Sequence, residues 1–372
     1  MMLPNEILQF VQKEKNTGME FVKRAQARGK GIYLYGAGAQ KLHTVRFLQK
    51  YGIKINAILD TFQQGSYREI PILRFEDFLL TNPDPESWFV ISSPSVEKEI
   101  RGTLERRFPA EHIFQFETTP YVEWIPDVEK YRTYLVEHWD ELSLLHDALA
   151  DEVSQKTLIN IIKGRISGRT DYFREIYAPD KYYPADVLRF SRDEILAEVG
   201  SYDGETLLEF LRHCPDYKAA YCFEPDQKNL RTLNRVVEET RQNGKIKVVP
   251  KGAWDCGTTL RFNESGGATN LSHAVEEASL EDDLVEVTTI DDAIREPVTY
   301  MTVSINGSEI RVLHGAEHQI QKNRPKLAVC VSYSGEELMD VWNYLRELVP
   351  EYRFYLRHHL EHGGIESFLY SI

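Results

Sequence analysis

One local arrangement occurs twice along this chain and restricts the folds that it can adopt. In each copy a short apolar strand runs into a glycine-containing turn, a helix follows, and a second strand ends in an acid. The copies extend from Gly36 to Asp60 and from Gly200 to Glu224, which is 24 positions in both cases. A strand, a helix and a strand in this order form a βαβ unit with parallel strands and a right-handed crossover. We therefore expect two α/β domains.

The pattern of apolar residues extends this expectation to the whole chain. Helical periodicity covers 4–29, with an interruption near 16–18, and the first copy lies among predicted strands at 31–35, 53–59, 88–92 and 112–116. Residues 121–170 show helical spacing and almost no strand signal, which predicts a helical connector. Seven strands are predicted after residue 195, at 195–199, 219–223, 246–250, 299–305, 326–332, 352–359 and 367–372.

The last two of these strands flank His362-Gly-Gly364 and predict a terminal antiparallel hairpin. The predicted fold class is α/β, with two Rossmann-like three-layer domains. Their predicted bounds are 1–120 for the N-terminal domain, 121–175 for the helical connector and 176–372 for the C-terminal domain.

The charge balance excludes several classes of partner. The 372 residues include 44 Lys and Arg against 58 Asp and Glu, a net charge of −14. Such a chain repels phosphate backbones and anionic lipids, so we expect neither a nucleic acid nor a membrane as partner. The sequence has no apolar run near the roughly 20 residues that span a bilayer, and its first residues do not resemble a signal peptide. The four cysteines lack metal-ligand spacing, so we expect no metal and a cytoplasmic protein.

Both glycine turns predict a site for the adenosine part of a ligand. An acid at the end of the second strand, Asp60 or Glu224, can accept hydrogen bonds from both hydroxyls of a ribose. Gly36, Gly38 and Asp60 thus form a candidate nucleotide pocket in the N-terminal domain. The alternative is that the two glycines serve only tight packing between strand and helix. Neither copy has all three glycines of the phosphate-binding fingerprint.

The second turn differs because it carries Glu198 and Asp203. These acids repel phosphates and favour a cationic ligand. S-adenosylmethionine carries an ammonium group and a sulfonium charge in addition to its adenosine. The alternative is that both acids only cap the following helix, which is worth about 0.3–1 kcal/mol.

Residues from about 169 to 372 resemble the FkbM-type family of S-adenosylmethionine-dependent methyltransferases. The resemblance rests on ordered segments, namely Tyr183-Pro184 with Asp186, Glu194–Thr206, Phe223–Asp226, Lys251–Asp255, Thr288–Asp292, Ile305–Glu309, Leu313–Ala316 and Tyr355–His359. It implies a class I methyltransferase sheet and methyl transfer to a hydroxyl of a sugar, glycan precursor or secondary metabolite. The N-terminal domain is similar, more weakly, to the nucleotide-binding-type domain of some sugar-modifying enzymes. The implied partner is a small-molecule or sugar-containing acceptor, and a homodimer stays open.

The resemblance also implies roles for single residues. Glu198, Gly200, Tyr202 and Asp203 would hold the methionine part of the cofactor, and Glu224 would bind its ribose. Trp254 and Asp255 would border the adenine, although Trp254 can also belong to the core and Asp255 can simply start a turn.

One departure from the family pattern affects the reaction site. The family commonly has Asp-x-Glu-Gly after the fourth strand, whereas this chain has Ser304, Asn306 and Gly307. Both carboxylates are thus replaced by neutral groups, and Glu309 is the acid that remains nearby. Alignment of the reactants survives this loss better than base catalysis does.

Four residues are candidates for catalysis and three for acceptor binding. The catalytic candidates are Ser304, Asn306, Glu309 and His358, the last because a neutral imidazole is a suitable base. The acceptor candidates are Asn270, in a polar loop at 263–270 that can act as a lid, Arg357 and His359. Adjacent strand residues point to opposite faces, so at most one of the two histidines can face the cleft. A lone histidine at a strand end is also often only a packed or solvated side chain.

These observations support three functional hypotheses. The first is a methyltransferase that acts on a hydroxyl group. The second is a binding or scaffold protein that keeps the fold but has lost turnover, because of Ser304 and Asn306. The third makes the N-terminal domain a nucleotide-sugar or NAD-linked unit, against which the missing third glycine and the absent Tyr-x-x-x-Lys pair both count.

Overall fold

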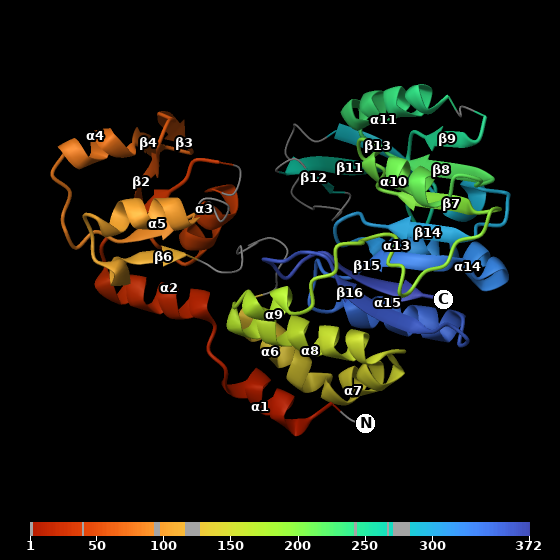
Figure 1. Ribbon diagram of the computed structural model, residues 1–372, viewed down its shortest axis with the longest axis horizontal. Coiled ribbons are helices and arrows are strands. Elements are labelled where there is room, and N and C mark those ends of the chain that lie inside the picture. Colours follow the sequence, from red (N-terminus) through yellow and green to blue (C-terminus); the bar gives the residue numbers. More distant parts are fainter. Residues whose placement is uncertain are drawn as a thin grey trace.

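The protein consists of two α/β domains joined by a helical connector (Figure 1). The computed structural model describes residues 3–38, 41–92, 97–115, 127–241, 244–265, 268–270 and 283–372. The N-terminal domain lies on the left of Figure 1 in red and orange, and the C-terminal domain lies on the right in green and blue. The helices of the connector lie below both domains in this view.

The N-terminal domain is built on a six-stranded sheet. Its order is β3-β4-β2-β1-β5-β6, and its strands are β1 (Ile32–Tyr35), β2 (Ile55–Asp60), β3 (Gly65–Tyr67), β4 (Ile70–Arg74), β5 (Phe89–Ile91) and β6 (Ile113–Gln115). The accompanying helices are α2 (Thr17–Arg28), α3 (Lys41–Lys50), α4 (Phe75–Leu80) and α5 (Glu97–Glu105), with a 3-10 turn at Ala110–His112. The pairs of β1 with β2 and with β5 are parallel, as expected. Sequence analysis missed β3, which is short and largely exposed, and β4, which is short and buries only alternate residues.

Four helices form the connector, and the first helix of the chain packs against them. The connector contains α6 (Val128–Glu137), α7 (Trp139–Ala148), α8 (Glu152–Ser167) and α9 (Asp171–Arg174). Helix α1 (Asn5–Lys13) contacts α6 and α8 and shares the core of the C-terminal domain through Ile7 and Val11. The predicted boundary assigned this helix to the N-terminal domain. Asp151 caps α8 by accepting a hydrogen bond from Ser154 N at 2.7 Å, and Gly168 ends the helix with φ +75°.

The C-terminal domain contains the predicted seven-stranded sheet. Its order is β16-β17-β15-β14-β7-β8-β9, from β7 (Ile195–Val199), β8 (Ala219–Phe223), β9 (Ile246–Val249), β14 (Tyr300–Val303), β15 (Lys326–Cys330), β16 (Phe354–His358) and β17 (Ser367–Ser371). Strands β7 and β8 are buried along their whole length, because helices cover both faces of the sheet. Strands β16 and β17 form the predicted antiparallel hairpin.

Two helices cover one face of this sheet, and three cover the other. Helices α10 (Glu205–His213) and α11 (Gln227–Thr240) pack on the first face. Helices α13 (Glu309–His314), α14 (Glu317–Asn323) and α15 (Glu337–Leu348) pack on the second, together with the connector. The carboxyl ends of β7, β8, β14 and β15 therefore meet at one edge, where open α/β sheets bind ligands.

A second sheet follows β9 and was not predicted. Its order is β10-β13-β11-β12, formed by β10 (Gly252–Ala253), β11 (Thr258–Ser265), β12 (Ala268–Asn270) and β13 (Asp283–Thr288), after which comes α12 (Ile290–Ala293). The expectation of a loop at 263–270 was wrong, because Asn263 pairs with Asn270 in antiparallel strands. The alternating Thr258–Phe262 segment pairs with β13, which gives the strand a partner.

Candidate functional site

The turn after β7 can approach its neighbours closely because two of its residues are glycines. Gly200 and Gly204 have φ of +88° and +93°. A Cβ on Gly200 would lie 2.4 Å from the carbonyl oxygen of Ser304, so the turns after β7 and β14 touch at this point. Tyr202 also has a positive φ of +48°, and its side chain is 49% exposed. The backbone of this turn is thus open to a ligand at the carboxyl edge of the sheet.

Glu224 joins the carboxyl end of β8 to this turn. Its side chain is buried, and its Oε2 accepts a hydrogen bond from Tyr202 N at 2.8 Å. Its Oε1 accepts hydrogen bonds from Asp226 N at 2.9 Å and from Asn229 Nδ2 at 3.4 Å. Burial raises the pKa of Glu224 to about 7. The structure therefore places the predicted ribose acid beside the turn, and half of these carboxyls are protonated at neutral pH.

Glu198 is a buried acid without a cation or a well-formed hydrogen bond among the described residues. Its side chain is 1% exposed, and neither carboxylate oxygen has a hydrogen-bond partner at ordinary distance and angle. The hydroxyl of Ser201 and the thiol of Cys222 lie near enough to oppose the rise in its pKa, but no N–H group or cation does so. Burial raises its pKa to about 7, and the nearby charge of Glu224 acts in the same direction. An unsatisfied buried carboxylate is costly, so a cationic donor would be bound favourably here. Asp203 differs, because its Oδ1 accepts a hydrogen bond from Glu205 N at 3.2 Å at the start of α10. The capping alternative thus describes Asp203 but not Glu198.

Trp254 and Asp255 lie just after β10. The backbone of Trp254 pairs with Thr288, and its side chain packs beside β11 and β13. Asp255 Oδ2 forms an ion pair with Arg311 Nη1 at 2.6 Å. Burial opposes ionisation of Asp255, but Arg311 outweighs it and lowers the pKa. Both residues border the ends of the strands, as their predicted role requires.

The turn after β14 contains three of the predicted catalytic residues. Ser304 N donates to Val199 O at 3.2 Å, which places Ser304 beside the Gly200 turn. Asn306 and Gly307 follow in the left-handed region, with φ of +67° and +102°. Glu309 is fully buried, and its two oxygens accept hydrogen bonds from Ile305 N at 2.9 Å and Gly307 N at 2.8 Å. Glu309 therefore stabilises the turn through two of its backbone N–H groups. Ser304 and Asn306 are half-buried polar residues of this turn.

The structure does not bring His358 and His359 to this turn. Strands β17 and β15 separate β16 from β14, which corresponds to about 14 Å at ordinary strand spacing. The ring nitrogens of His358 contact Ser367 Oγ at 2.9 Å and Leu360 O at 2.7 Å, and those of His359 contact Ala178 O at 2.6 Å and Tyr370 Oη at 2.8 Å. Burial lowers the pKa of His358 to about 3 and that of His359 to about 4. Both rings are therefore neutral and held by the protein itself.

Arg357 is also occupied by partners within the chain. Its side chain is 3% exposed, and its Nη2 lies 2.7 Å from an oxygen of Asp151 and of Asp186. Its Nη1 donates to Ser154 Oγ at 2.8 Å. Arg357 thus ties β16 to the start of α8. The remaining acceptor candidate, Asn270, ends β12 opposite Asn263.

The N-terminal domain repeats the contact between acid and turn. Asp60 Oδ2 accepts a hydrogen bond from Ala37 N at 2.9 Å, next to Gly36 with φ +113°. Asp60 Oδ1 accepts hydrogen bonds from Phe62 N at 2.9 Å and Gln63 N at 3.0 Å. Lys41 Nζ donates to Ala37 O at 2.8 Å and also lies near Gly38 O. At the predicted nucleotide pocket, the carboxylate of Asp60 thus already accepts three backbone hydrogen bonds, and Lys41 lies beside the turn.

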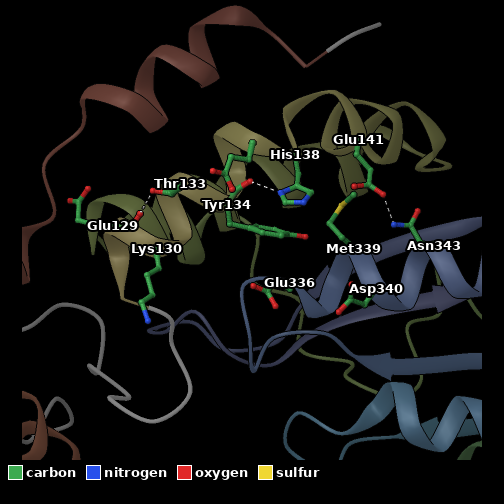
Figure 2. A pocket seen from close by; sticks show the side chains of 11 residues that line it. Glu129, Lys130, Thr133, Tyr134, His138, Glu141, Glu336, Met339, Asp340 and Asn343 are labelled. Atoms are coloured by element: carbon green, nitrogen blue, oxygen red, sulfur yellow. Dashed lines mark hydrogen bonds between the residues drawn. The ribbon is translucent and has the colours of Figure 1, made fainter.

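A groove of about 760 Å³ lies elsewhere, between α6, α7 and α15 (Figure 2). Asn343 Nδ2 donates to Glu141 Oε1 at 2.5 Å across it, and its other charged lining residues are mostly acids. In the part of the chain that the structure describes, no group of three His, Cys, Asp or Glu side chains could hold a metal ion. No helix there is long and apolar enough to cross a membrane.

Comparison with known proteins agrees with this geometry. The family model of the methyltransferase FkbM domain matches residues 198–359. Residues 198–359 thus contain an FkbM methyltransferase domain. The protein is therefore a methyltransferase, and the match includes Glu198, Glu224 and the turn after β14. No curated protein sequence matches the chain.

Solved structures share the fold of this methyltransferase. The methyltransferase FkbM from Methylobacillus flagellatus KT is 22% identical, with 99% of this chain and 98% of that chain covered and a TM-score of 0.77. This similarity confirms the predicted α/β fold across the chain. An rRNA methylase from Streptococcus thermophilus is 14% identical, covering 54% and 91% of the two chains, with a TM-score of 0.33. A fibrillarin from Aeropyrum pernix with natively bound S-adenosyl-L-methionine is 10% identical, covering 50% and 70%, with a TM-score of 0.31.

Sequence analysis missed two residues that hold the loop after β15, next to the turn after β14. Glu337 begins α15 and is buried against Glu309, and Arg165 of α8 reaches the loop after β15. A signal for Glu337 was present, because Ser334 and Glu337 have the spacing of a capping box. Ser334 Oγ indeed accepts a hydrogen bond from Glu337 N at 3.0 Å. That pattern predicts the start of a helix, however, and gives no indication of a second buried acid beside it.

Proposed function

We propose that the C-terminal domain binds S-adenosylmethionine and transfers its methyl group to a hydroxyl oxygen of a sugar, a glycan precursor or a secondary metabolite. The observation that carries the proposal is the buried carboxyl of Glu198, which has no cation and no well-formed hydrogen bond, beside the open Gly200 turn. The ammonium group of the cofactor supplies the missing donor, and its positive charge pairs with the carboxylate of Glu198 in a partly dehydrated cleft.

In this proposal each part of the cofactor lies at one element. Glu224 accepts hydrogen bonds from the ribose hydroxyls at the end of β8. Trp254 and Asp255 border the adenine after β10. The bound cofactor supplies an electrophilic methyl group on a positively charged sulfur.

The chain contributes alignment of the acceptor more than base catalysis. Ser304 and Asn306 are neutral, and Glu309 is buried with both oxygens bound to backbone N–H groups. Ser304 and Asn306 therefore orient the acceptor hydroxyl by hydrogen bonds. The sulfur–methyl bond breaks as the oxygen–methyl bond forms, and the hydroxyl proton passes to water, leaving S-adenosylhomocysteine. Alignment of this kind can supply on the order of 7–11 kcal/mol of the barrier.

Calorimetry with the full-length protein tests cofactor binding directly. We expect S-adenosylhomocysteine and S-adenosylmethionine to bind, and ATP to bind much more weakly because two acids face its phosphates. Glu224→Gln should weaken binding of S-adenosylhomocysteine by about tenfold or more, since it removes an ionised acceptor. Asp216→Asn is the matched control, because Asp216 precedes β8 at the opposite edge of the sheet. Absence of binding up to millimolar concentration would refute the proposal.

Turnover separates the methyltransferase from a protein that only binds the cofactor. Release of S-adenosylhomocysteine is measured with a panel of sugars, nucleotide-sugars and hydroxylated metabolites. Release that depends on one of these acceptors supports transfer to oxygen. Binding without release across the panel would favour loss of turnover at the Ser304 and Asn306 turn.

A further inference from the structure

Two buried carboxyl groups meet beneath the turn after β14. Glu309 is 0% exposed and Glu337 is 7% exposed. Glu309 accepts hydrogen bonds from the backbone N–H groups of Ile305 and Gly307. Glu337 Oε2 accepts a hydrogen bond from Tyr333 N at 2.8 Å, in the loop that follows β15. Each carboxyl thus holds the backbone of a different loop at the carboxyl edge of the sheet.

The remaining oxygen of Glu337 has no donor among the described residues, and it lies within hydrogen-bonding reach of Glu309. Two ionised carboxylates in contact inside a protein would repel each other strongly. Burial raises the pKa of both groups, and the charge of Glu309 raises that of Glu337 further. One proton between the two carboxyls removes the repulsion and satisfies the unpartnered oxygen.

The surroundings favour a pair with a single negative charge. Arg165 of α8 lies near Glu337 and acts to lower its pKa. Its guanidinium donates to Ser332 O at 2.8 Å and Gly364 O at 2.9 Å, so its position is fixed by the backbone. Among the described residues, Cys330 of β15 and Tyr333 are titratable groups that interact with the pair, and burial keeps both of them neutral. The positive charge of Arg165 therefore balances the single negative charge that Glu309 and Glu337 share.

Resting on the proposed function, we propose that Glu337 is a positioning residue for methyl transfer, because it shares a proton with Glu309 and thereby holds the Ile305–Gly307 turn against the cofactor turn. This turn includes two residues with positive φ, and Ser304 before it marks the contact with Gly200. A displaced turn would move Ser304 and Asn306 away from the reaction site. Glu337 acts only through Glu309 and touches no ligand.

Two substitutions of Glu337 separate the shared proton from the volume of the side chain. Glu337→Gln keeps the shape, supplies a permanent N–H donor to ionised Glu309 and preserves the charge of the pair. Glu337→Leu keeps most of the volume but removes the hydrogen bond. Glu336→Gln is the matched control, because Glu336 is the exposed neighbour of Glu337.

Infrared spectroscopy of the full-length protein detects the shared proton without any cofactor. We compare the carbonyl band of protonated carboxyl groups at about pH 8.5, where Glu198 and Glu224 are mostly ionised because their pKa values are about 7. Wild type should show a band that Glu337→Gln lacks and Glu336→Gln retains. An unchanged band in Glu337→Gln would overturn the shared proton.

Hydrogen exchange and cofactor affinity test the positioning. In Glu337→Leu the amides of Ile305 and Gly307 should lose protection, and S-adenosylhomocysteine affinity should fall by about tenfold or more. Glu337→Gln should bind within about threefold of wild type and should lack the loss of affinity that wild type shows at alkaline pH, where the shared proton dissociates. Unchanged exchange and affinity in Glu337→Leu would overturn the positioning role.

The measurements keep this inference separate from the proposed function. If wild type binds no S-adenosylhomocysteine, the cofactor proposal fails, whereas the infrared band and the exchange of the two amides still decide the role of Glu337. If Glu337→Leu does not fold, the infrared band of Glu337→Gln and the pH dependence of its affinity at alkaline pH decide the role of Glu337.

Discussion

Cofactor binding should release protons, because the two acids beside the Gly200 turn are half protonated near neutral pH. Glu198 and Glu224 both have pKa values raised to about 7 by burial. A cationic or hydroxyl-bearing ligand favours the ionised form of each carboxyl and lowers its pKa in the complex. At pH 6, one unit below this pKa, about nine-tenths of each carboxyl carries a proton in the free protein. Binding should therefore release close to two protons at pH 6 and almost none at about pH 8.5.

The same linkage predicts how affinity depends on pH. For each proton released, the affinity for S-adenosylhomocysteine should rise up to tenfold per pH unit below pH 7 and level off above it. The amino group of the ligand is already charged at pH 6, so it contributes no opposing uptake. Since Glu198 and Glu224 influence each other, the two protons belong to the pair rather than to either residue.

Calorimetry in two buffers of different ionisation enthalpy counts these protons. Glu198→Gln should release one proton fewer than wild type at pH 6, and its affinity should have a correspondingly shallower pH dependence. At about pH 8.5 it should bind about 10- to 100-fold more weakly than wild type, because it loses a charge-assisted hydrogen bond. Wild-type binding without proton release at pH 6, or equal release from Glu198→Gln, would refute the reasoning.

Three further predictions concern stability. Gly200→Ala should lower the free energy of unfolding by about 1–3 kcal/mol in denaturant, because φ is +88° and the new Cβ would lie 2.4 Å from Ser304 O. Gly38→Ala is the control: a Cβ there has open space around it, so the free energy of unfolding should change little. Arg357→Met should cost about 1–3 kcal/mol, since it removes the hydrogen bonds of the buried guanidinium to Asp151 and Asp186, whose carboxylates stay partly in solvent; an effect below about 0.5 kcal/mol would contradict this structural role. Without cofactor, the free energy of unfolding should fall by about 3 kcal/mol for each of Glu198 and Glu224 as pH rises from 4.5 to about 7, because the folded state holds these two protons more tightly than the unfolded chain. Glu224→Gln should remove the part of this pH dependence that Glu224 contributes.

Sequence patterns predicted the elements that are buried on both faces and missed those that depend on a distant partner. The runs Ile195–Val199 and Ala219–Phe223 are continuous apolar strands, and they lie at the centre of the sheet. By contrast, β11 is stabilised by pairing with β13, which lies about 25 residues further along the chain. A strand that depends on such a partner gives a weak local signal.

The candidate site was predictable where topology alone brings residues together. Parallel strands bring the acid near the end of β7 and the acid after β8 to one edge, so Glu198 and Glu224 could be placed from the order of elements. The environment of Arg357 could not, because its partner Asp151 lies 206 positions earlier in the chain. Whether Arg357 contacts a ligand or another side chain depends on how the connector packs against β16, and the sequence around Arg357 does not indicate this packing.

The two copies of the repeated arrangement differ in protonation, and this difference can locate the ligand. Burial alone would raise the pKa of Asp60, but three backbone N–H donors and Lys41 outweigh it and lower the pKa. Asp60 is therefore already ionised at pH 6, whereas Glu224 is mostly protonated there. At pH 6, an adenosine-containing ligand that binds at the Gly36 turn should release no proton, while the same ligand at the Gly200 turn should release close to one from Glu224. The proton count thus distinguishes the two domains as the binding site, even though both present an acid and a glycine turn to a ribose.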